Sequence, residues 1–272
     1  MAYTVLMSIY HGSSSEDLNR CLASLEQQTR QADEIVIVED GPVNDDVTHC
    51  LRSYSPTLPI RTIALQNNIG LGGALRVGLL QCKNNIVARV DSDDWSAKQR
   101  MELQEDFLAN NPSISVVAAQ MREWHSTRSG PISAVRSVPL TSDKIVRLSR
   151  WKNPINHPTV MFRKSDVLEC GNYCDQPFFE DYHLWARMIK QRKQFVNLPQ
   201  ILVDTVVDDD YFRRRGGFRY VLNEISLARS LHKLNCFSTA RMLIFILGRL
   251  PTRLMPTVYR RIIYKALLRK KK

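Results

Sequence analysis

Short apolar runs alternate with amphipathic stretches over the first half of the chain. Runs rich in β-branched residues predict strands, and stretches with apolar residues at helical spacing predict helices. We expect strands at 3–10, 33–40, 59–65, 85–91 and 113–124, and helices at 13–29, 43–54, 70–82 and 96–111. Such alternation favours a mostly parallel central sheet with helices on both faces, a Rossmann-like α/β fold. The alternation ends near residue 123, so the second half should be added to this sheet.

Polar side chains stand where three of these strands end. The first strand ends in Tyr10, the second in Glu39 and Asp40, and the fourth in Asp91. Ligands of open α/β sheets bind beyond the carboxyl ends of the strands. We therefore expect the acidic residues to line a single cleft.

Three carboxylates crowd together in the stretch "VARVDSDDW" at residues 87–95: Asp91, Asp93 and Asp94. Like charges this close raise one another's pKa unless a cation lies among them. The alternatives are a solvated turn with a helix cap and a metal site. The residues of this stretch alone leave both open.

The glycine-rich stretch "NNIGLGGAL" partly fits the dinucleotide fingerprint G-x-G-x-x-G. Gly70 and Gly72 match it, but Leu75 stands where Gly or Ala is required, and the stretch follows the third strand instead of the first. We therefore favour small residues that let a helix pack closely on the sheet, an arrangement compatible with a nearby ligand.

The composition is ordinary for a globular protein, with 44% hydrophobic and 24% charged residues among 272. Six scattered cysteines form no CxxC pair, which favours free thiols in a reducing cytosol. The first residues lack the features of a signal peptide. We expect no membrane-spanning helix, because no apolar run reaches the required length.

The net charge of +11 is concentrated at one end. Residues 241–272 hold ten Lys or Arg and no Asp or Glu, whereas the remainder is nearly balanced. This distribution argues against nucleic-acid binding by the main fold and indicates an anionic partner for the C-terminus.

The basic tail mixes apolar and cationic residues. Pro251 and Pro256 should divide it into two short helices. Apolar Ile262, Ile263, Ala266 and Leu267 recur at helical spacing among Arg261, Lys265 and Arg269. This pattern is typical of an interfacial helix on an anionic bilayer. The alternative is a helix that packs on the main domain and exposes its basic face.

Several stretches, in order, resemble family 2 glycosyltransferases of the GT-A fold. The first half contributes "VLMSIYHGSSSEDLNRCLASLEQQT", "DEIVIVEDGP", "NNIGLGGALRVGL" and "ARVDSDDW". The stretches "NPINHPTVMFRKSDV", "FFEDYHLWARMI" and "YFRRRGG" resemble members that build bacterial surface polysaccharides. The resemblance covers roughly residues 3–230.

On the donor side, the resemblance implies that Asp91 and Asp93 form the DxD motif. In this family the motif holds Mn²⁺ or Mg²⁺, which bridges it to the diphosphate of a nucleotide sugar. Asp91 would thus contact both metal and donor, and Asp94 could be a further ligand or only a helix cap.

The resemblance also implies a nucleotide site. Asp40 matches the acid that binds uracil or ribose, while Glu39 departs from the aspartate usual at its position. The strand end that packs on the base matches Ser8 and Tyr10, and Asn68 with Gly70 matches the glycine-rich segment beneath the nucleotide.

On the acceptor side, the resemblance implies that Asp181 is the base of an inverting transfer, with Glu180 as its partner. His183 replaces an acid usual in the family and would alter acceptor contacts or face solvent. His157 matches an acceptor-side segment. Arg214 or Arg215 would hold the donor diphosphate.

Together these features predict a metal-dependent inverting transferase that moves a hexose from a UDP-sugar, glucose or galactose type favoured, to a polyprenyl-diphosphate-linked sugar. It would lie at the cytoplasmic face of the membrane and act in O-antigen or capsule assembly. Residues 1–235 would form the GT-A domain, with a donor half at 1–123 and an acceptor half at 124–235, and 236–272 the helical tail. The alternatives are a sugar nucleotidyltransferase and a non-catalytic nucleotide-sugar-binding scaffold.

Overall fold

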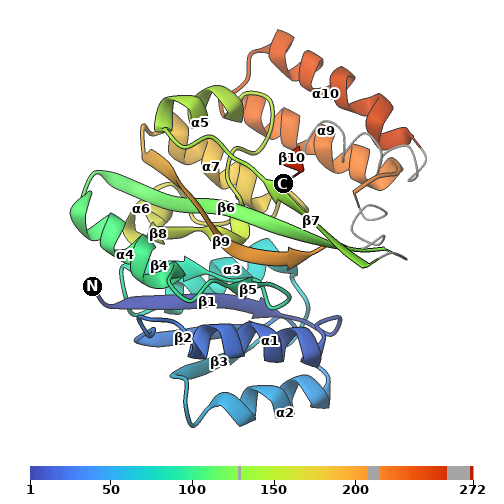
Figure 1. The fold of residues 1–272 in the computed structure, drawn as a ribbon. Coiled ribbons are helices and arrows are strands. Elements are labelled where there is room, and N and C mark those ends of the chain that lie inside the picture. Colours follow the sequence, from blue (N-terminus) through green and yellow to red (C-terminus); the bar gives the residue numbers. More distant parts are fainter. Residues whose placement is uncertain (128–129, 208–214, 256–269, 272) are drawn as a thin grey trace.

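A mixed β-sheet with helices on both faces forms the centre of the molecule (Figure 1). The computed structural model describes residues 1–127, 130–207, 215–255 and 270–271 of the chain. Within this part of the chain, no helix is both long and apolar enough to cross a membrane.

The first half alternates strands and helices as predicted. Its elements are β1 (Tyr3–Ile9), α1 (Ser15–Glu26), β2 (Glu34–Glu39), α2 (Asp45–Tyr54), β3 (Ile60–Ala64), α3 (Gly70–Gln81) and β4 (Ile86–Arg89). β1 pairs in parallel with β2 and with β4, and β2 pairs in parallel with β3. The carboxyl ends of these strands therefore lie along one edge of the sheet.

The second half extends this sheet with mostly antiparallel pairs. Its elements are β5 (Trp95–Ser96), α4 (Arg100–Asn110), β6 (Ile114–Thr127), β7 (Gly130–Arg136), α5 (Ser142–Ser149), the 3₁₀ helix η1 (His157–Thr159), β8 (Met161–Arg163), α6 (Lys164–Glu169), α7 (Glu180–Lys190), β9 (Gln194–Val206), α9 (Phe218–Lys233), α10 (Thr239–Leu254) and β10 (Lys270–Lys271). β8 lies antiparallel between β4 and β6, and β6 pairs in parallel with β9. The GT-A architecture expected from the sequence is confirmed, with a sheet that is mixed beyond β4.

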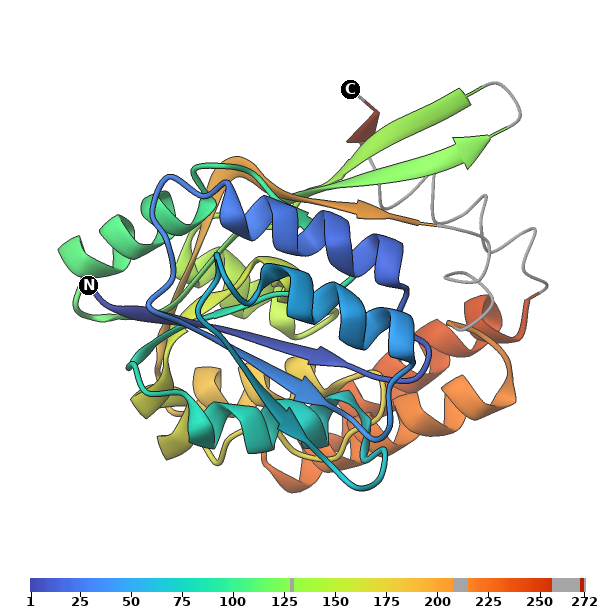
Figure 2. The same ribbon diagram turned by 90° about the horizontal axis from the view of Figure 1, so that it is seen from below.

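Side chains of successive residues in the parallel strands point to opposite faces of the sheet and pack into two separate cores. Leu6 and Val36 pack with α3 on one face, and Met7 and Ile37 pack with α1 on the other. Figure 2 shows α1 and α2 above the strands and α3 below them. Both faces are covered, which explains why these strands read as nearly continuous apolar runs.

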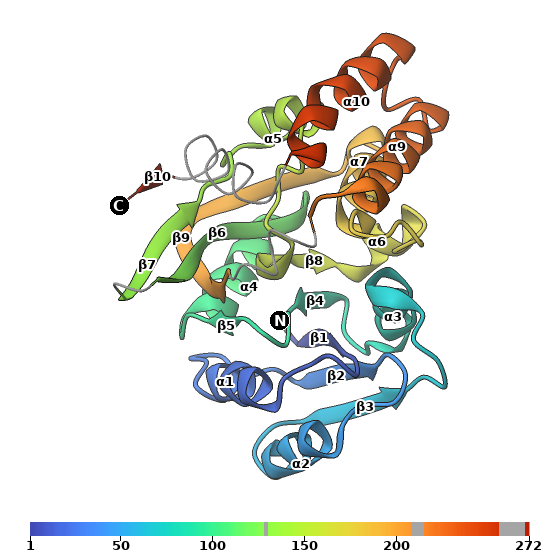
Figure 3. The same cartoon turned by 90° about the vertical axis from the view of Figure 1, so that its right-hand side faces the viewer.

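A third core joins α7, α9 and α10. Tyr182 of α7, Leu227 of α9 and Phe245 of α10 belong to it. Figure 3 shows α10 against α9 at the outer edge of the molecule. Residues 239–254 thus pack on the domain, which is the alternative arrangement named above for this part of the tail.

The predicted helix break at Pro251 is wrong. α10 continues past it to Leu254, because Arg249 and Arg253 on either side both bind Glu224 of α9. The last turn is closed by the Met255 N–H, which donates to the Pro251 carbonyl. The break at Pro256 and the apolar face at 262–267 lie outside the described residues.

Candidate active site

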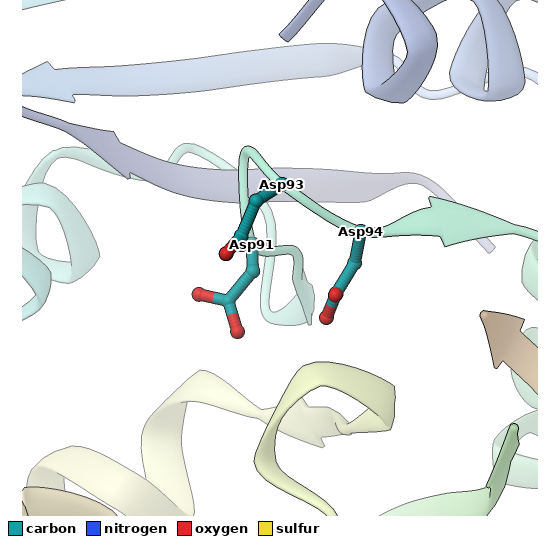
Figure 4. Close-up of side chains that lie close together, drawn as sticks. All are labelled: Asp91, Asp93 and Asp94. Atoms are coloured by element: carbon teal, nitrogen blue, oxygen red, sulfur yellow. The ribbon is translucent and has the colours of Figure 1, made fainter. Parts of the chain in front are cut away.

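Three carboxylates converge in the turn between β4 and β5. One oxygen each of Asp91, Asp93 and Asp94 can be chosen so that all lie within 4.8 Å of one another (Figure 4). The turn is closed by the Asp94 N–H, which donates to the Asp91 carbonyl at 3.3 Å. Asp94 is buried, whereas Asp93 is exposed.

Mutual repulsion and burial act on these carboxylates. Partial desolvation by the surrounding protein, followed by the charge of Asp91, raises the pKa of Asp93 to about 6. The same two causes raise the pKa of Asp94 well above its ordinary value. Hard carboxylate oxygens at this spacing suit a divalent cation such as Mn²⁺ or Mg²⁺, whose charge would offset the repulsion. The residues present therefore fit a metal site.

Arg89, at the end of β4, is a site residue that the sequence reasoning missed. Its guanidinium is buried and binds both carboxylate oxygens of Asp91. A charged residue inside an otherwise apolar strand was the available signal, since buried arginines need a partner. Arg89 supplies a fixed positive charge directly behind the acidic turn.

Asp40 links the end of β2 to the segment that precedes α3. Its Oδ1 accepts from the Ile69 N–H at 2.7 Å, and its carbonyl accepts from Asn68 Nδ2 at 3.0 Å. Gly41 has a φ of +81°, and a Cβ there would lie 2.8 Å from the Asn68 nitrogen. The end of β2 and the start of α3 are thus held together where the sequence predicted a nucleotide.

Tyr10 and Asp40 lie next to each other at the sheet edge, because β1 and β2 pair in parallel up to Ile9 opposite Glu39. Tyr10 is exposed, and its ring meets His11 edge-on at 5.1 Å between centroids. Ser8 and Glu39 are half-buried. Gly70, with a φ of +79°, begins α3 beside this edge.

Asp181 lies in the first turn of α7 and has both carboxylate oxygens hydrogen-bonded. Asn153 Nδ2 donates to Oδ2 at 2.5 Å, and the Tyr182 N–H donates to Oδ1 at 2.6 Å. Burial raises the pKa of Asp181. Burial and then the charge of Asp181 raise the pKa of Glu180. A raised pKa makes a carboxylate a better proton acceptor.

The two acidic groups are electrostatically connected through Arg89. Its positive charge acts on both Glu180 and Asp181, and the charge of Asp91 acts on Glu180. The acidic turn and the pair Glu180–Asp181 therefore belong to one site, although about ninety residues separate them in the sequence.

Close backbone packing fixes the distance between the two sides. A Cβ on Gly72 of α3 would lie 2.8 Å from the Cys174 carbonyl oxygen and 3.1 Å from the Glu180 Cβ. No larger residue fits there without a shift. Gly72 therefore lets α3 sit directly against the segment that carries Glu180.

Arg215 also belongs to this region. Burial lowers the pKa of Arg215 to about 10, and the negative charges of Glu123 and Asp181 act on it. Its carbonyl accepts from Arg253 at 3.4 Å. Arg214, predicted as the alternative diphosphate ligand, lies outside the described residues.

Both histidines predicted for acceptor contact are buried. His157 Nε2 lies 3.0 Å from the Tyr173 hydroxyl, and the His157 ring packs edge-on against Trp185. In α7, His183 lies between Cys174 Sγ at 2.9 Å and Ser230 Oγ at 2.8 Å. The alternative that His183 faces solvent is wrong, since its neighbours in the sequence and α9 enclose it. Their burial favours positioning roles over contact with an acceptor.

The chain is similar to known bacterial glycosyltransferases along nearly its whole length. It is 35% identical to the amylovoran biosynthesis glycosyltransferase AmsE of Erwinia amylovora over 97% of this chain and 98% of the relative. It is 32% identical to the UDP-Gal:alpha-D-GlcNAc-diphosphoundecaprenol beta-1,3-galactosyltransferase of Escherichia coli, over 98% of this chain and 97% of the relative.

Solved structures share the fold. TarS of S. aureus in complex with UDP-GlcNAc matches with a TM-score of 0.66 and 18% identity, over 98% of this chain and 76% of that one. A mannosyltransferase of Pyrobaculum calidifontis in complex with GDP-Man and Mn²⁺ matches with a TM-score of 0.61 and 15% identity, over 97% and 79%. The model of glycosyl transferase family 2 matches residues 4–171. The chain belongs to glycosyl transferase family 2 and is a glycosyltransferase.

Proposed function

We propose that this enzyme transfers a hexosyl residue, galactose first among candidates, from a UDP-sugar to a sugar on a polyprenyl diphosphate, with inversion at the anomeric carbon. The observation that carries the proposal is the convergence of the acidic turn at Asp91 and the carboxylate Asp181 around the buried Arg89. The activity named for the Escherichia coli relative supports the choice of donor and acceptor.

On the donor side, Asp91 and Asp93 would hold Mn²⁺ or Mg²⁺. The metal would neutralise the diphosphate as it leaves. Asp40 offers a carboxylate to the base or ribose, and one of its oxygens accepts no hydrogen bond from the residues that the structure describes. Tyr10 offers an exposed ring for stacking. The binding of UDP-GlcNAc and of GDP-Man with Mn²⁺ by proteins of the same fold supports this assignment.

On the acceptor side, Asp181 accepts the proton of the attacking hydroxyl. The hydrogen bonds from Asn153 and from the Tyr182 N–H fix the carboxylate in one orientation. Glu180 acts beside it as a second negative charge that keeps the pKa of the pair high.

The proposed acceptor indicates where in the cell the enzyme acts. A sugar carried on a polyprenyl diphosphate resides at a membrane surface, so we infer a peripheral enzyme on the cytoplasmic face. The ten cationic residues of 241–272 would favour an anionic leaflet. Nucleic acid is not a partner in this proposal, because the rest of the chain carries almost no net charge.

A panel of nucleotide sugars with a short-chain GlcNAc-diphospho-lipid tests the proposal. Release of UDP and formation of a disaccharide lipid should occur with UDP-galactose or UDP-glucose, and Asp181→Asn run in parallel should form almost none. NMR of the product should show a β-linkage from the α-linked donor. An α-linked product, or turnover with a GDP-sugar only, would contradict the proposal.

A further inference from the structure

Among the residues that the structure describes, nothing covers an apolar surface on the outer side of α10. Four of its side chains are 50–64% exposed: Leu243, Ile244, Leu247 and Leu254. Residues 243, 247 and 254 recur at the spacing that places side chains on one face of a helix. Large apolar side chains gathered this way on a monomer mark an interaction site more often than chance exposure.

The surface continues onto α9. Phe218 is 70% exposed and Leu222 is 50% exposed at the start of that helix. A groove between the two helices is lined by Val221, Ile225, Ile246 and Leu250, with Glu224 and Arg249 beneath. We call the exposed set Phe218, Leu222, Leu243, Ile244, Leu247 and Leu254 the outer apolar face.

The rotation of α10 is fixed by contacts on its inner side. Glu224 is buried and binds Arg249 at 2.6 Å and Arg253 at 2.9 Å, and Arg249 also donates to the Trp151 carbonyl at 2.7 Å. Phe245 packs against Tyr182 and Phe237. The arginines of this helix therefore point back to the domain, and the outer apolar face cannot turn inward without breaking a buried ion pair.

The charge of the residues next to the outer apolar face favours a lipid surface over a second copy of the chain as its partner. The basic segment that follows α10 in the sequence, residues 256–272, contains seven Lys or Arg and no Asp or Glu. Two copies joined face to face would bring two such segments together, and like charges would oppose the pairing. An anionic phospholipid surface attracts the cations and accepts the apolar side chains.

We propose that the outer apolar face of α9 and α10 docks on an anionic phospholipid bilayer. The acceptor assigned under the proposed function gives the enzyme a reason to bind there, and the inference rests on that function. Because the face belongs to a helix pair that shares a core with α7, docking fixes how the helix carrying Asp181 is oriented toward the membrane. The Leu side chains enter the interface, and anionic headgroups attract the cations of residues 256–272.

Vesicle co-sedimentation of the full chain tests this without donor or acceptor. The vesicles are phosphatidylcholine alone and phosphatidylcholine mixed with phosphatidylglycerol. The variant is Leu243→Ser/Leu247→Ser, and its matched control is Leu80→Ser, which changes a leucine of α3 that is 58% exposed. Removing two apolar contacts of this size should weaken partitioning about tenfold or more, while the control binds like the wild type.

Equal sedimentation of the double variant and the wild type would overturn the proposal. So would a wild-type dimer in solution that the double variant dissociates while vesicle binding is unchanged, because the occupant would then be a second copy. Activity on a soluble acceptor analogue should be the same for both variants. Failure of the glycosyl transfer assay alone would count against the proposed function and leave the vesicle result intact.

Discussion

Arg89 holds both carboxylate oxygens of Asp91 from inside the protein. The Arg89 side chain is 2% exposed, whereas that of Asp91 is 28% exposed. A carboxylate already oriented in this way needs little rearrangement to bind a cation, and the arginine offsets the charge of the neighbouring acids while the site is empty. The acidic turn is therefore preorganised by the strand that precedes it.

Replacing Arg89 by Met should cost both stability and activity. Breaking a buried ion pair on one side costs about 3 kcal/mol or more, because the remaining carboxylates lose their counter-charge. Urea unfolding at neutral pH measures the loss, and UDP release measures activity. Arg89→Lys keeps the charge and should lose less stability; equal losses for both variants would show that shape, not charge, matters here.

Asp93→Asn should abolish transfer and yet stabilise the metal-free protein. The pKa of Asp93, about 6, lies above the ordinary value near 4. The folded state thus binds this proton more tightly, and its stability falls as the pH rises from about 4 through about 6. The side-chain amide of Asp93→Asn does not titrate, so the variant avoids this loss of stability. Thermal unfolding at pH 7 in EDTA should give a higher Tm for the variant.

Addition of Mn²⁺ and UDP should reverse the order of the two Tm values. The wild type should gain Tm on addition of both ligands, and Asp93→Asn should gain little. Full activity of the wild type in excess chelator would contradict the metal role of the acidic turn.

Asp181→Asn should lower kcat by about 10²–10⁴-fold, the usual contribution of a general base, with little change in UDP binding. In the wild type, burial raises the pKa of both Asp181 and Glu180. The acid limb of the pH–kcat profile should therefore lie above the ordinary carboxyl range. Glu180→Gln removes a neighbouring negative charge and should move that limb to lower pH. Near-normal kcat in Asp181→Asn, with a large loss in Glu180→Gln, would exchange the two roles.

His183→Phe should affect stability more than acceptor binding. The ring nitrogens of His183 contact Cys174 and Ser230. Loss of these contacts should lower the free energy of unfolding by about 1–3 kcal/mol. Burial lowers the pKa of His183 to about 4. The folded state binds this proton less tightly than the unfolded state, so wild-type stability declines as the pH falls from about 6.5 towards 4. The variant should decline less over that range, at an unchanged acceptor KM; a raised KM with normal stability would restore the acceptor role.

Shortening the chain after Met255 should leave the domain stable, whereas shortening it after Ser238 should not. The second cut removes Phe245 from a shared core and leaves Glu224 buried without Arg249 and Arg253. A loss of about 3 kcal/mol or more is expected. Circular dichroism melts of the two truncated chains, compared with the full chain, measure it. Equal Tm values for all three would mean that α10 contributes nothing to folding.

The local part of the fold could be predicted because its determinants are local. β1 has apolar residues on both faces, and Ser14 caps α1 by accepting from the Asp17 N–H. The positions of Asp40 and Asp91 follow from strand ends in a parallel sheet. These features depend on residues close in sequence and on one general rule of topology.

Features set by distant partners could not be predicted. Pro251 predicts a helix end, but Arg249 and Arg253 on either side of it bind Glu224 of α9, 25 and 29 residues away. For His183 the sequence leaves acceptor contact and solvent exposure open, because nothing near it in sequence reveals Ser230, 47 residues away. In each case a contact made by the folded chain overrides the local preference.

Gly72 limits which segments can be exchanged between family members in a chimaera. A Cβ there would meet the Cys174 carbonyl oxygen and the Glu180 Cβ, so the segment that carries Glu180 and the proposed base Asp181 packs against bare backbone on α3. A chimaera that takes its acceptor half from another family member inherits that member's shape at this contact. Specificity grafts should therefore move α3 and the start of α7 as one unit, with the glycine kept.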